Sequence, residues 1–207
     1  MREAVIVSAA RTPIGRAYRG AFNNTQPQEL GGHVIAEVVK RAGVDPAEID
    51  DVVMGAALQQ GAQSFNTARQ AALRGGLPVS VVAVTIEHQC SSGLMGVAIA
   101  AKQIIVDNMD ITIGGGVESI SLVQTPQMRV APDHELLAMH GDIYMPMLQT
   151  AEVVAARYGV GRDAQDEYGF QSQQRTAAAQ AAGKFADEIV PVTATMNVVN
   201  KETKEVT

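Results

Sequence analysis

Apolar residues along the first part of the chain fall into two patterns, which predict strands alternating with helices. Short, β-branched runs bounded by polar residues or glycine predict buried strands, and these runs are residues 4–10, 51–56, 81–86 and 110–113. Apolar side chains at helical spacing predict helices, and these segments are residues 28–42, 66–73 and 94–105. This alternation predicts a largely buried α/β sheet up to about residue 119.

The pattern changes after Ser119. Residues 122–146 contain prolines, methionines and scattered polar side chains without a clear period. Two helices are then expected at 149–158 and 163–182, with acidic residues in the first turns of the second and Gly183 after its end. The expected organisation is therefore an N-terminal α/β domain over 1–119 and an incomplete helical domain over 120–207.

Cys90, the only cysteine of the chain, lies where the strand at 81–86 turns into the helix at 94–105. Ser91, Ser92 and Gly93 are residue types favoured where a helix begins. Unpaired backbone N–H groups and the positive end of the helix dipole point toward such a position. Both favour a thiolate and can stabilise an oxyanion that forms beside the sulfur, so Cys90 is a candidate nucleophile.

Two other interpretations of this stretch remain open. A lone cysteine is often an inert core residue, and the helix after Cys90 is apolar on nearly all sides, which predicts burial. His88 could form an activated Cys–His pair if the chain stays extended as far as Cys90. The helical turn that starts there is instead expected to rotate the two side chains apart.

Composition excludes several classes of protein. The net charge of −6 argues against a general nucleic-acid binder, and a single cysteine excludes an intrachain disulfide framework or a cysteine-cluster zinc site. The four histidines show no metal-ligand spacing. No apolar run is expected to span a membrane, and the N-terminus does not resemble a secretory signal, so a cytoplasmic protein is expected.

Two glycine- or proline-containing loops have open roles. The loop Arg11-Thr12-Pro13-Ile14-Gly15 follows a predicted strand, so it could carry function or serve only as a rigid connector. Gly114, Gly115 and Gly116 lack the Lys-Ser or Lys-Thr of a phosphate loop. They are expected to let the backbone pass close to a neighbouring element or a ligand.

Four segments, in order and at matching spacing, resemble thiolases, which are acetyl-CoA acetyltransferases or 3-ketoacyl-CoA thiolases. The segments are AVIVSAARTPIGRAYRGAF (4–22), HQCSSGL (88–94), IGGGVESIS (113–121) and QTAEVVAARYGVGRDAQDEYGFQSQQRTAAAQAAGKFADEIVPV (149–192). The resemblance implies an α/β/α layered domain, with a mixed sheet and buried helices, followed by the start of a helical loop domain. It also implies that four strands of the family's first sheet are present.

The resemblance further implies an acyltransferase that acts on CoA thioesters through an S-acyl intermediate on Cys90. The backbone N–H of Cys90 would contribute to the oxyanion hole, and Met147 would contact CoA. No tightly bound cofactor is implied, because CoA and acyl-CoA are substrates. The implied setting is fatty acid metabolism, in a homodimer or homotetramer that binds neither nucleic acid nor membrane.

The chain also departs from the family pattern. Thiolases usually carry asparagine where this chain has Glu87, and glycine where it has Leu148. Their second half supplies an activating histidine and a second cysteine that acts as acid and base, and the chain has neither motif. The sequence is therefore expected to be an N-terminal half, inactive by itself. The alternatives are a non-catalytic half that binds acyl-CoA or a partner chain, and a related ketoacyl or hydroxymethylglutaryl synthase.

Overall fold

The computed structural model describes residues 2–128, 131–200 and 202–207, and its central feature is a three-stranded parallel sheet. The strands are β1 (Asp51–Gly55), β2 (Val82–Ile86) and β3 (Thr112–Gly116), in the order β2-β1-β3. β1 is buried along its whole length because it pairs with a neighbour on each side. The α/β class is confirmed, but all the described strands are parallel where a mixed sheet was expected.

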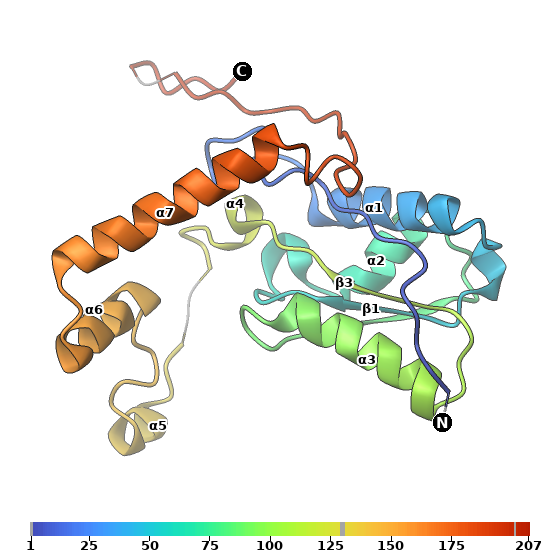
Figure 1. The fold of residues 1–207 in the computed structure, drawn as a ribbon, viewed down its shortest axis with the longest axis horizontal. Helices are drawn as coiled ribbons and strands as arrows, with labels where there is room; N and C mark the ends of the chain where they lie inside the picture. Colours follow the sequence, from blue (N-terminus) through green and yellow to red (C-terminus); the bar gives the residue numbers. More distant parts are fainter. Residues whose placement is uncertain (1, 129–130, 201) are drawn as a thin grey trace. The chain divides into compact units, whose positions relative to one another are not determined.

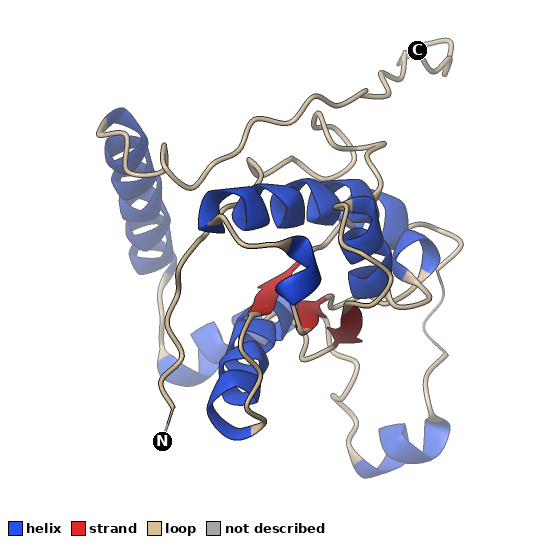
Figure 2. Ribbon diagram, turned by 90° about the vertical axis from the view of Figure 1, so that its right-hand side faces the viewer, coloured by secondary structure: helices blue, strands red, loops and turns tan. Residues whose placement is uncertain are grey.

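Helices cover both faces of this sheet (Figures 1 and 2). Helix α2 (Thr67–Arg74) packs on β1 and β2, and α1 (Pro27–Ala42) packs on α2. Helix α3 (Ser92–Val106) packs on the opposite face, against β1 and β3. The main core lies between α1, α2 and the sheet, and its most buried members are Ile35, Val52, Ala68, Ala71, Ala72 and Val81. The three-layer arrangement expected from the sequence is therefore present.

Local sequence signals explain where the first helices begin and end. Gly43 ends α1 in the left-handed conformation, with φ 68°, which glycine adopts without steric cost. Asp45 and Glu48 form a reciprocal capping box around the short 3₁₀ helix η1 (Pro46–Glu48). Asn66 caps α2 by accepting a hydrogen bond from the Arg69 backbone N–H, just after the 3₁₀ helix η2 (Gly61–Gln63).

The strand predicted at residues 4–10 does not form. Val5, Ile6 and Val7 are 71%, 82% and 73% exposed, although their composition predicted a buried strand. A strand requires a neighbour that satisfies its backbone N–H and C=O groups. Residues 4–10 have no such neighbour in the described part of the chain. The nearest backbone pairing is a single parallel bridge between Arg11, just beyond this run, and Ile189. The sheet therefore has three described strands rather than four.

Strand β2 and helix α3 are less buried than the sequence predicted. Val82 and Val84 of β2 remain exposed, because α3 packs mainly on β1 and β3 and leaves this face of β2 uncovered. α3 faces the sheet with Ser92, Gly96 and Ala100, while its outer face, including Leu94, has no covering element among the described residues. Apolar composition alone cannot show whether a second partner covers such a helix.

The expectation that no run could span a membrane was wrong as a statement of length and composition. Among the described residues, the segment Gln89–Val106 is 18 residues long with a mean hydropathy of 1.2, and by length and composition it could cross a membrane. The core helix of a soluble protein can be as long and as apolar, although such a helix is mostly buried. Of the segment Gln89–Val106, 17% is buried.

The chain divides into two compact units. One comprises Met1–Met128 with Glu188–Thr207, and the other is Arg129–Asp187. The short helix α4 (Ile120–Val123) belongs to the first unit, whereas α5 (His134–Met139), α6 (Met147–Tyr158) and α7 (Arg162–Ala181) form the second. This division differs from the predicted boundary after residue 119, because 188–207 returns to the first unit.

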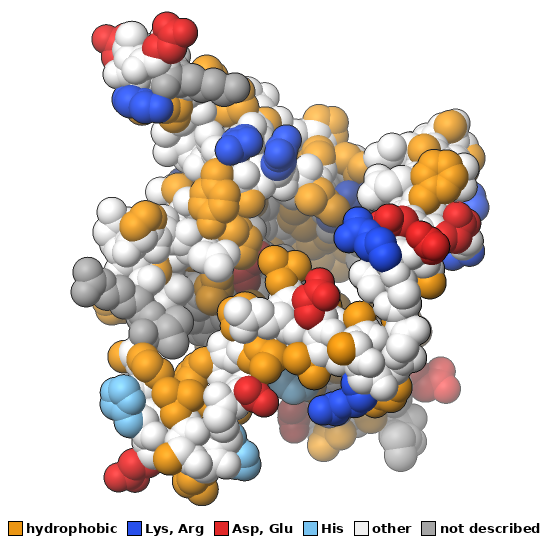
Figure 3. Space-filling view, turned by 90° about the vertical axis from the view of Figure 1, so that its left-hand side faces the viewer, with side chains coloured by type: hydrophobic (Ala, Val, Ile, Leu, Met, Phe, Trp, Pro, Cys, Tyr) orange, Lys and Arg blue, Asp and Glu red, His pale blue; other side chains and the backbone are white. Residues whose placement is uncertain are grey.

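The second unit has little core of its own. The two long helices predicted there are present as α6 and α7, and neither these helices nor α5 contains a buried residue. Apolar side chains are spread over the face of the molecule drawn in Figure 3. Within this unit, Tyr158, Tyr168 and Phe170 are each more than half exposed.

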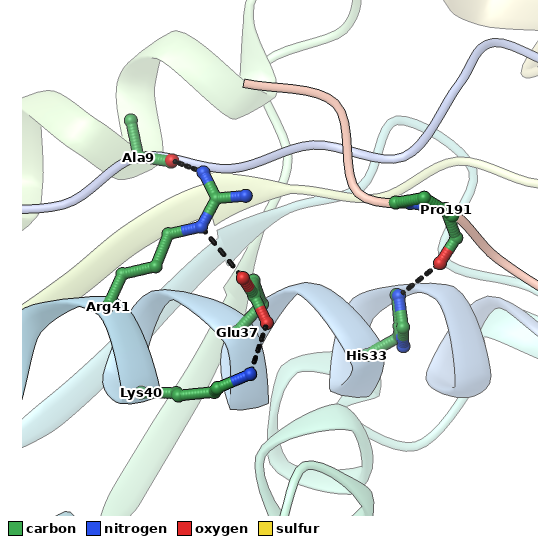
Figure 4. Close-up of polar contacts among 6 residues, drawn as sticks. All are labelled: Ala9, His33, Glu37, Lys40, Arg41 and Pro191. Carbon is green, nitrogen blue, oxygen red and sulfur yellow. Dashed lines mark hydrogen bonds and ion pairs between the residues drawn. The ribbon is translucent and has the colours of Figure 1, made fainter. Parts of the chain in front are cut away.

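Helix α1 holds both the N-terminal segment and the returning segment within the first unit (Figure 4). The Arg41 Nη1 donates to the Ala9 carbonyl oxygen at 2.9 Å, and the His33 Nε2 lies 3.0 Å from the Pro191 carbonyl oxygen. The Arg11 backbone N–H donates to the Glu188 carbonyl oxygen, and the Val190 N–H donates to that of Arg11, both at 2.8 Å. These contacts explain why 188–207 does not continue the helical unit.

Glu37 is expected to keep the N-terminal segment attached to α1. Its carboxylate accepts a hydrogen bond from the Arg41 Nε at 2.8 Å, and this bond is the main reason that the pKa of Glu37 lies below its ordinary value of 4.5. Since the pKa is lowered on folding, the contribution is present above the ordinary value and is lost as the pH falls through the lower one. Glu37→Gln is expected to speed proteolysis of residues 2–10 at pH 7 by about twofold, as for an exposed pair.

Glu29→Gln is the matched control, since it removes the α1 ion pair with Arg74 and leaves Arg41 untouched. The wild-type protein is expected to release the segment only in acid, after Glu37 is protonated. Equal cleavage rates for both variants at pH 7, measured by mass spectrometry of the fragments, would contradict this role.

Candidate active site

Cys90 lies in the turn between β2 and α3, at the end of the sheet where the parallel strands have their carboxyl ends. It is a free thiol, and it is exposed. The expectation that Cys90 would be buried is therefore wrong for the chain as described, and its reactivity stays a prediction. In open parallel α/β sheets, the carboxyl ends of the strands are where ligands usually bind.

The turn that carries Cys90 is held by hydrogen bonds between neighbouring residues. Gln89 has φ 49°, in the left-handed region that non-glycine residues adopt at a cost of about 1–3 kcal/mol. Its backbone N–H donates to the Glu87 Oε1 at 2.6 Å, and its carbonyl oxygen accepts from the Ser92 Oγ at 2.6 Å. The Ser92 Oγ also accepts from the His88 backbone N–H at 2.8 Å. These bonds stabilise the sharp bend immediately before Cys90.

Three glycines seat the N-terminus of α3 directly on the strand ends. A side-chain Cβ at Gly55, the last residue of β1, would lie 2.1 Å from the Ser92 carbonyl carbon. A Cβ at Gly116, the last residue of β3, would lie 2.9 Å from the Gly93 Cα. Only residues without side chains allow the backbones to approach this closely. We call Gly55, Gly93 and Gly116 the glycine seat.

The triple glycine of the sequence has the packing role that was expected. A Cβ at Gly114 would lie 2.7 Å from the Val97 Cα, and one at Gly96 would lie 2.6 Å from the Gly115 carbonyl oxygen. Helix α3 therefore packs backbone to backbone along β3. Its first turn, and with it Cys90, is fixed relative to the sheet.

Cys90 is accessible to a reactant, because its side chain is exposed and no hydrogen bond to its sulfur occurs within residues 2–128, 131–200 and 202–207. Its backbone forms an isolated bridge with that of His88. Cys90 directly precedes the N-cap residue of α3, Ser91, so the positive end of the helix dipole lies next to it. A helix N-terminus is a feature that stabilises a thiolate or an oxyanion.

His88 does not pair with Cys90. The His88 Nδ1 lies 3.0 Å from the Ser91 Oγ, and no hydrogen bond in the described structure joins the ring to the sulfur. This outcome agrees with the expected rotation of the two side chains away from each other. In the part of the chain that the structure describes, no group of three or more His, Cys, Asp or Glu side chains could hold a metal ion.

A buried glutamine and a nearby carboxylate also belong to this end of the sheet, and the sequence did not identify them as a pair. Gln63 is completely buried, and its Nε2 donates to the Glu118 Oε1 at 2.5 Å. Glu118 occurs in a segment quoted for the family resemblance, but Gln63 carries no local signal. The two residues are 55 positions apart, so their contact was not detectable from spacing.

The loop Arg11-Thr12-Pro13-Ile14-Gly15 borders a cavity of about 220 Å³, lined also by Phe22, Leu30, Glu118 and Ser119. Arg16 and Glu118 are the charged residues of its lining, and no role is assigned to this loop. Met147 is the first residue of α6 and is 72% exposed. It belongs to the second unit, so its proximity to Cys90 stays a prediction.

Comparison with known proteins agrees with this architecture. Residues 4–206 match the family model described as "Thiolase, N-terminal domain". The chain is 42% identical to a 3-ketoacyl-CoA thiolase of Bacillus subtilis (strain 168), over 99% of this chain and 52% of that protein. It is also 42% identical to an acetyl-CoA acetyltransferase of Paracoccus denitrificans, over 93% of this chain and 52% of that protein.

A solved structure shows the same fold. The acetyl-CoA acetyltransferase of Bacillus anthracis matches with a TM-score of 0.79 and 33% identity, over 100% of this chain and 54% of that chain. The chain thus spans about half the length of the curated relatives it matches. The chain belongs to the thiolase family and corresponds to its N-terminal half.

Proposed function

We propose that this chain supplies the nucleophile of an acyltransferase that acts on CoA thioesters. The reaction is thiolytic cleavage of a 3-ketoacyl-CoA or, in reverse, condensation of two acetyl-CoA molecules. Family membership supports this reaction class, since relatives are named 3-ketoacyl-CoA thiolase and acetyl-CoA acetyltransferase. The full reaction belongs to a complete enzyme, of which this chain represents about half by length.

The observation that carries the proposal is the position of Cys90. Its thiol is exposed at the N-terminus of α3, on a turn held by hydrogen bonds and on a helix held by the glycine seat. A thiolate is the reactive form of cysteine, and helix N-termini favour it. The place of Cys90 directly before the N-cap residue of α3 supports the second part of the proposal, in which its backbone N–H donates to the oxyanion of an acyl group bound to the sulfur.

The proposed chemistry proceeds in two steps. The Cys90 thiolate attacks the keto carbon of the 3-ketoacyl-CoA, the carbon–carbon bond to the CoA-bearing fragment breaks, and that fragment takes up a proton to become acetyl-CoA. The thiolate of a second CoA then attacks the S-acyl carbonyl carbon, which releases the shortened acyl-CoA and regenerates the Cys90 thiolate. Both steps need a proton donor or acceptor that no described side chain contributes by hydrogen bonding to Cys90.

The proposed CoA site includes the N-terminus of α6. Met147 and Leu148 begin this helix and are 72% and 85% exposed. An exposed methionine is a flexible apolar surface for a ligand such as CoA. CoA enters as substrate, and we propose no tightly bound cofactor.

A second candidate function is binding without catalysis. The exposed apolar side chain of Leu94 on the outer face of α3 supports it, since this side chain is 74% exposed and no described element covers it. In that case the chain would bind acyl-CoA or a partner chain, such as the missing C-terminal half, without forming an acyl-enzyme. A cytoplasmic location and a homodimer or homotetramer stay predictions.

Thiolysis of acetoacetyl-CoA by CoA tests the catalytic proposal. The chain is assayed alone and together with the C-terminal half of a full-length relative such as the Bacillus subtilis protein. Two acetyl-CoA molecules per acetoacetyl-CoA consumed are expected only when both halves are present. Tight binding of the second half with no turnover would favour the binding function instead.

A further inference from the structure

The loops that follow β1 and β3 are joined by the carboxylate of Glu118. Its Oε2 accepts a hydrogen bond from the Ala57 backbone N–H at 2.7 Å, just beyond the end of β1. Its Oε1 accepts from the Gln63 Nε2 at 2.5 Å. Hydrogen bonds to an ionised acceptor are about twice as strong as neutral ones, so this carboxylate is a firm link between the two loops.

Gln63 extends this link into the interior. The side chain is completely buried, and besides Glu118 its Nε2 donates to the Leu58 carbonyl oxygen at 3.0 Å. Its Oε1 accepts from the Ser119 backbone N–H at 2.6 Å. Every polar atom of the amide has a partner, which fixes the orientation of the amide and makes any lost partner costly.

The two joined loops directly follow Gly55 and Gly116, two of the three residues of the glycine seat. Ala57 follows Gly55 by two residues, and Glu118 follows Gly116 by two residues. The Val117 backbone N–H also donates to the Gly55 carbonyl oxygen at 3.0 Å, directly between the two strand ends. A change in the spacing of these ends would move Ser92 and Gly93, and therefore the turn that presents Cys90.

We propose that Glu118 is a positioning residue for Cys90, which holds the two strand ends at the spacing that the N-terminus of α3 requires. The inference rests on the proposed function, in which Cys90 is the nucleophile. Glu118 acts through the glycine seat and not by contact with substrate.

The substitution Glu118→Gln tests the role of the carboxylate with little change in size. An amide has one acceptor oxygen and one donor nitrogen, so it cannot accept from both the Ala57 N–H and the Gln63 Nε2. Either the Ala57 N–H or the Gln63 Nε2 would then face the new amide nitrogen, which is itself a donor. Glu118→Asp keeps the charge but has a shorter side chain, so it is expected to keep one of the two bonds and to act in the same direction. Glu135→Gln, on the exposed helix α5, is the control.

The readout is the rate of alkylation of Cys90 by iodoacetamide as a function of pH, on the full 207-residue chain, where it is the only cysteine. For Glu118→Gln we expect a rate at neutral pH that is about threefold lower and a pH profile shifted upward, because the helix terminus no longer faces the thiolate correctly. Glu135→Gln is expected to match the wild type. The folded state of each variant is checked by circular dichroism at the assay temperature.

A purely structural role would lower the thermal midpoint of Glu118→Gln and leave the rate and the pH profile of Cys90 unchanged, and that result would overturn the proposal. If Glu118→Gln does not fold, the same measurement on Glu118→Asp tests the proposal. A wild-type alkylation rate and pH profile in that variant would also overturn it. Alkylation requires no CoA chemistry. Failure of acyl transfer would therefore count against the proposed function, whereas an unchanged profile would count against the positioning role.

Discussion

Alanine at Gly55 is expected to displace the N-terminus of α3 and to destabilise the fold by about 3 kcal/mol or more. The new Cβ would lie 2.1 Å from the Ser92 carbonyl carbon and 2.2 Å from its oxygen. Both contacts are with backbone, so no side-chain rotation relieves them. Overpacking of a well-packed interior usually costs about 1–3 kcal/mol, and a clash between two backbones is at the upper end of this range or beyond it.

Gly115→Ala provides a matched control within the same sheet. Gly115 lies in β3, and a Cβ there meets nothing within 4 Å. Urea unfolding followed by circular dichroism is expected to show a large loss for Gly55→Ala and little change for Gly115→Ala. Similar stability of the two variants would show that the glycine seat does not constrain α3.

Serine at Cys90 is expected to lower thiolase activity by at least about 10⁴-fold, the scale seen when a covalent nucleophile is removed. The substitution is close in size, but a serine hydroxyl is not ionised near neutral pH and is a much weaker nucleophile than a thiolate. An oxygen ester would also transfer its acyl group to CoA far less readily than a thioester. The assay is thiolysis of acetoacetyl-CoA with the complementing half present.

Ser91→Ala is the control for this experiment, because Ser91 is adjacent to Cys90 and its hydroxyl bonds only to His88 in the described structure. We expect it to retain most of the activity. If Cys90→Ser retained activity within tenfold of the wild type, Cys90 would not be the nucleophile.

Elements specified by nearby residues were predictable from the sequence. The end of α1 at Gly43, the helix predicted at 66–73 and the two long helices of the second unit each follow from local spacing and helix-stop signals. The run at 51–56 was predicted as a buried strand, and β1 (Asp51–Gly55) confirms it, since this strand pairs on both sides and is buried along its length. These features depend on a few neighbouring side chains, and no distant contact is needed to recognise them.

Burial was less predictable because it depends on elements distant in sequence. Residues 4–10 and the outer face of α3 have the composition of a core, yet Val5, Ile6, Val7 and Leu94 are each more than two-thirds exposed. The return of 188–207 to the first unit was missed for a related reason. Its contacts with Arg11 and His33 join residues more than 150 positions apart.

The candidate site also combines a feature that nearby residues specify with features that depend on distant contacts. The location of Cys90 at a strand-to-helix junction could be predicted from the residues immediately around it. The left-handed Gln89, the close approach at Gly55 and the Gln63–Glu118 hydrogen bond were not, since each depends on backbone geometry or on a partner elsewhere in the fold.

Intact-protein mass spectrometry after mixing with acetoacetyl-CoA, with the complementing half present, tests the central claim most directly. The account predicts one added acetyl group, which peptide mapping places on Cys90 and which disappears when CoA is added. An unmodified Cys90 in a mixture that nevertheless turns over, or an acetyl group on another residue, would contradict it.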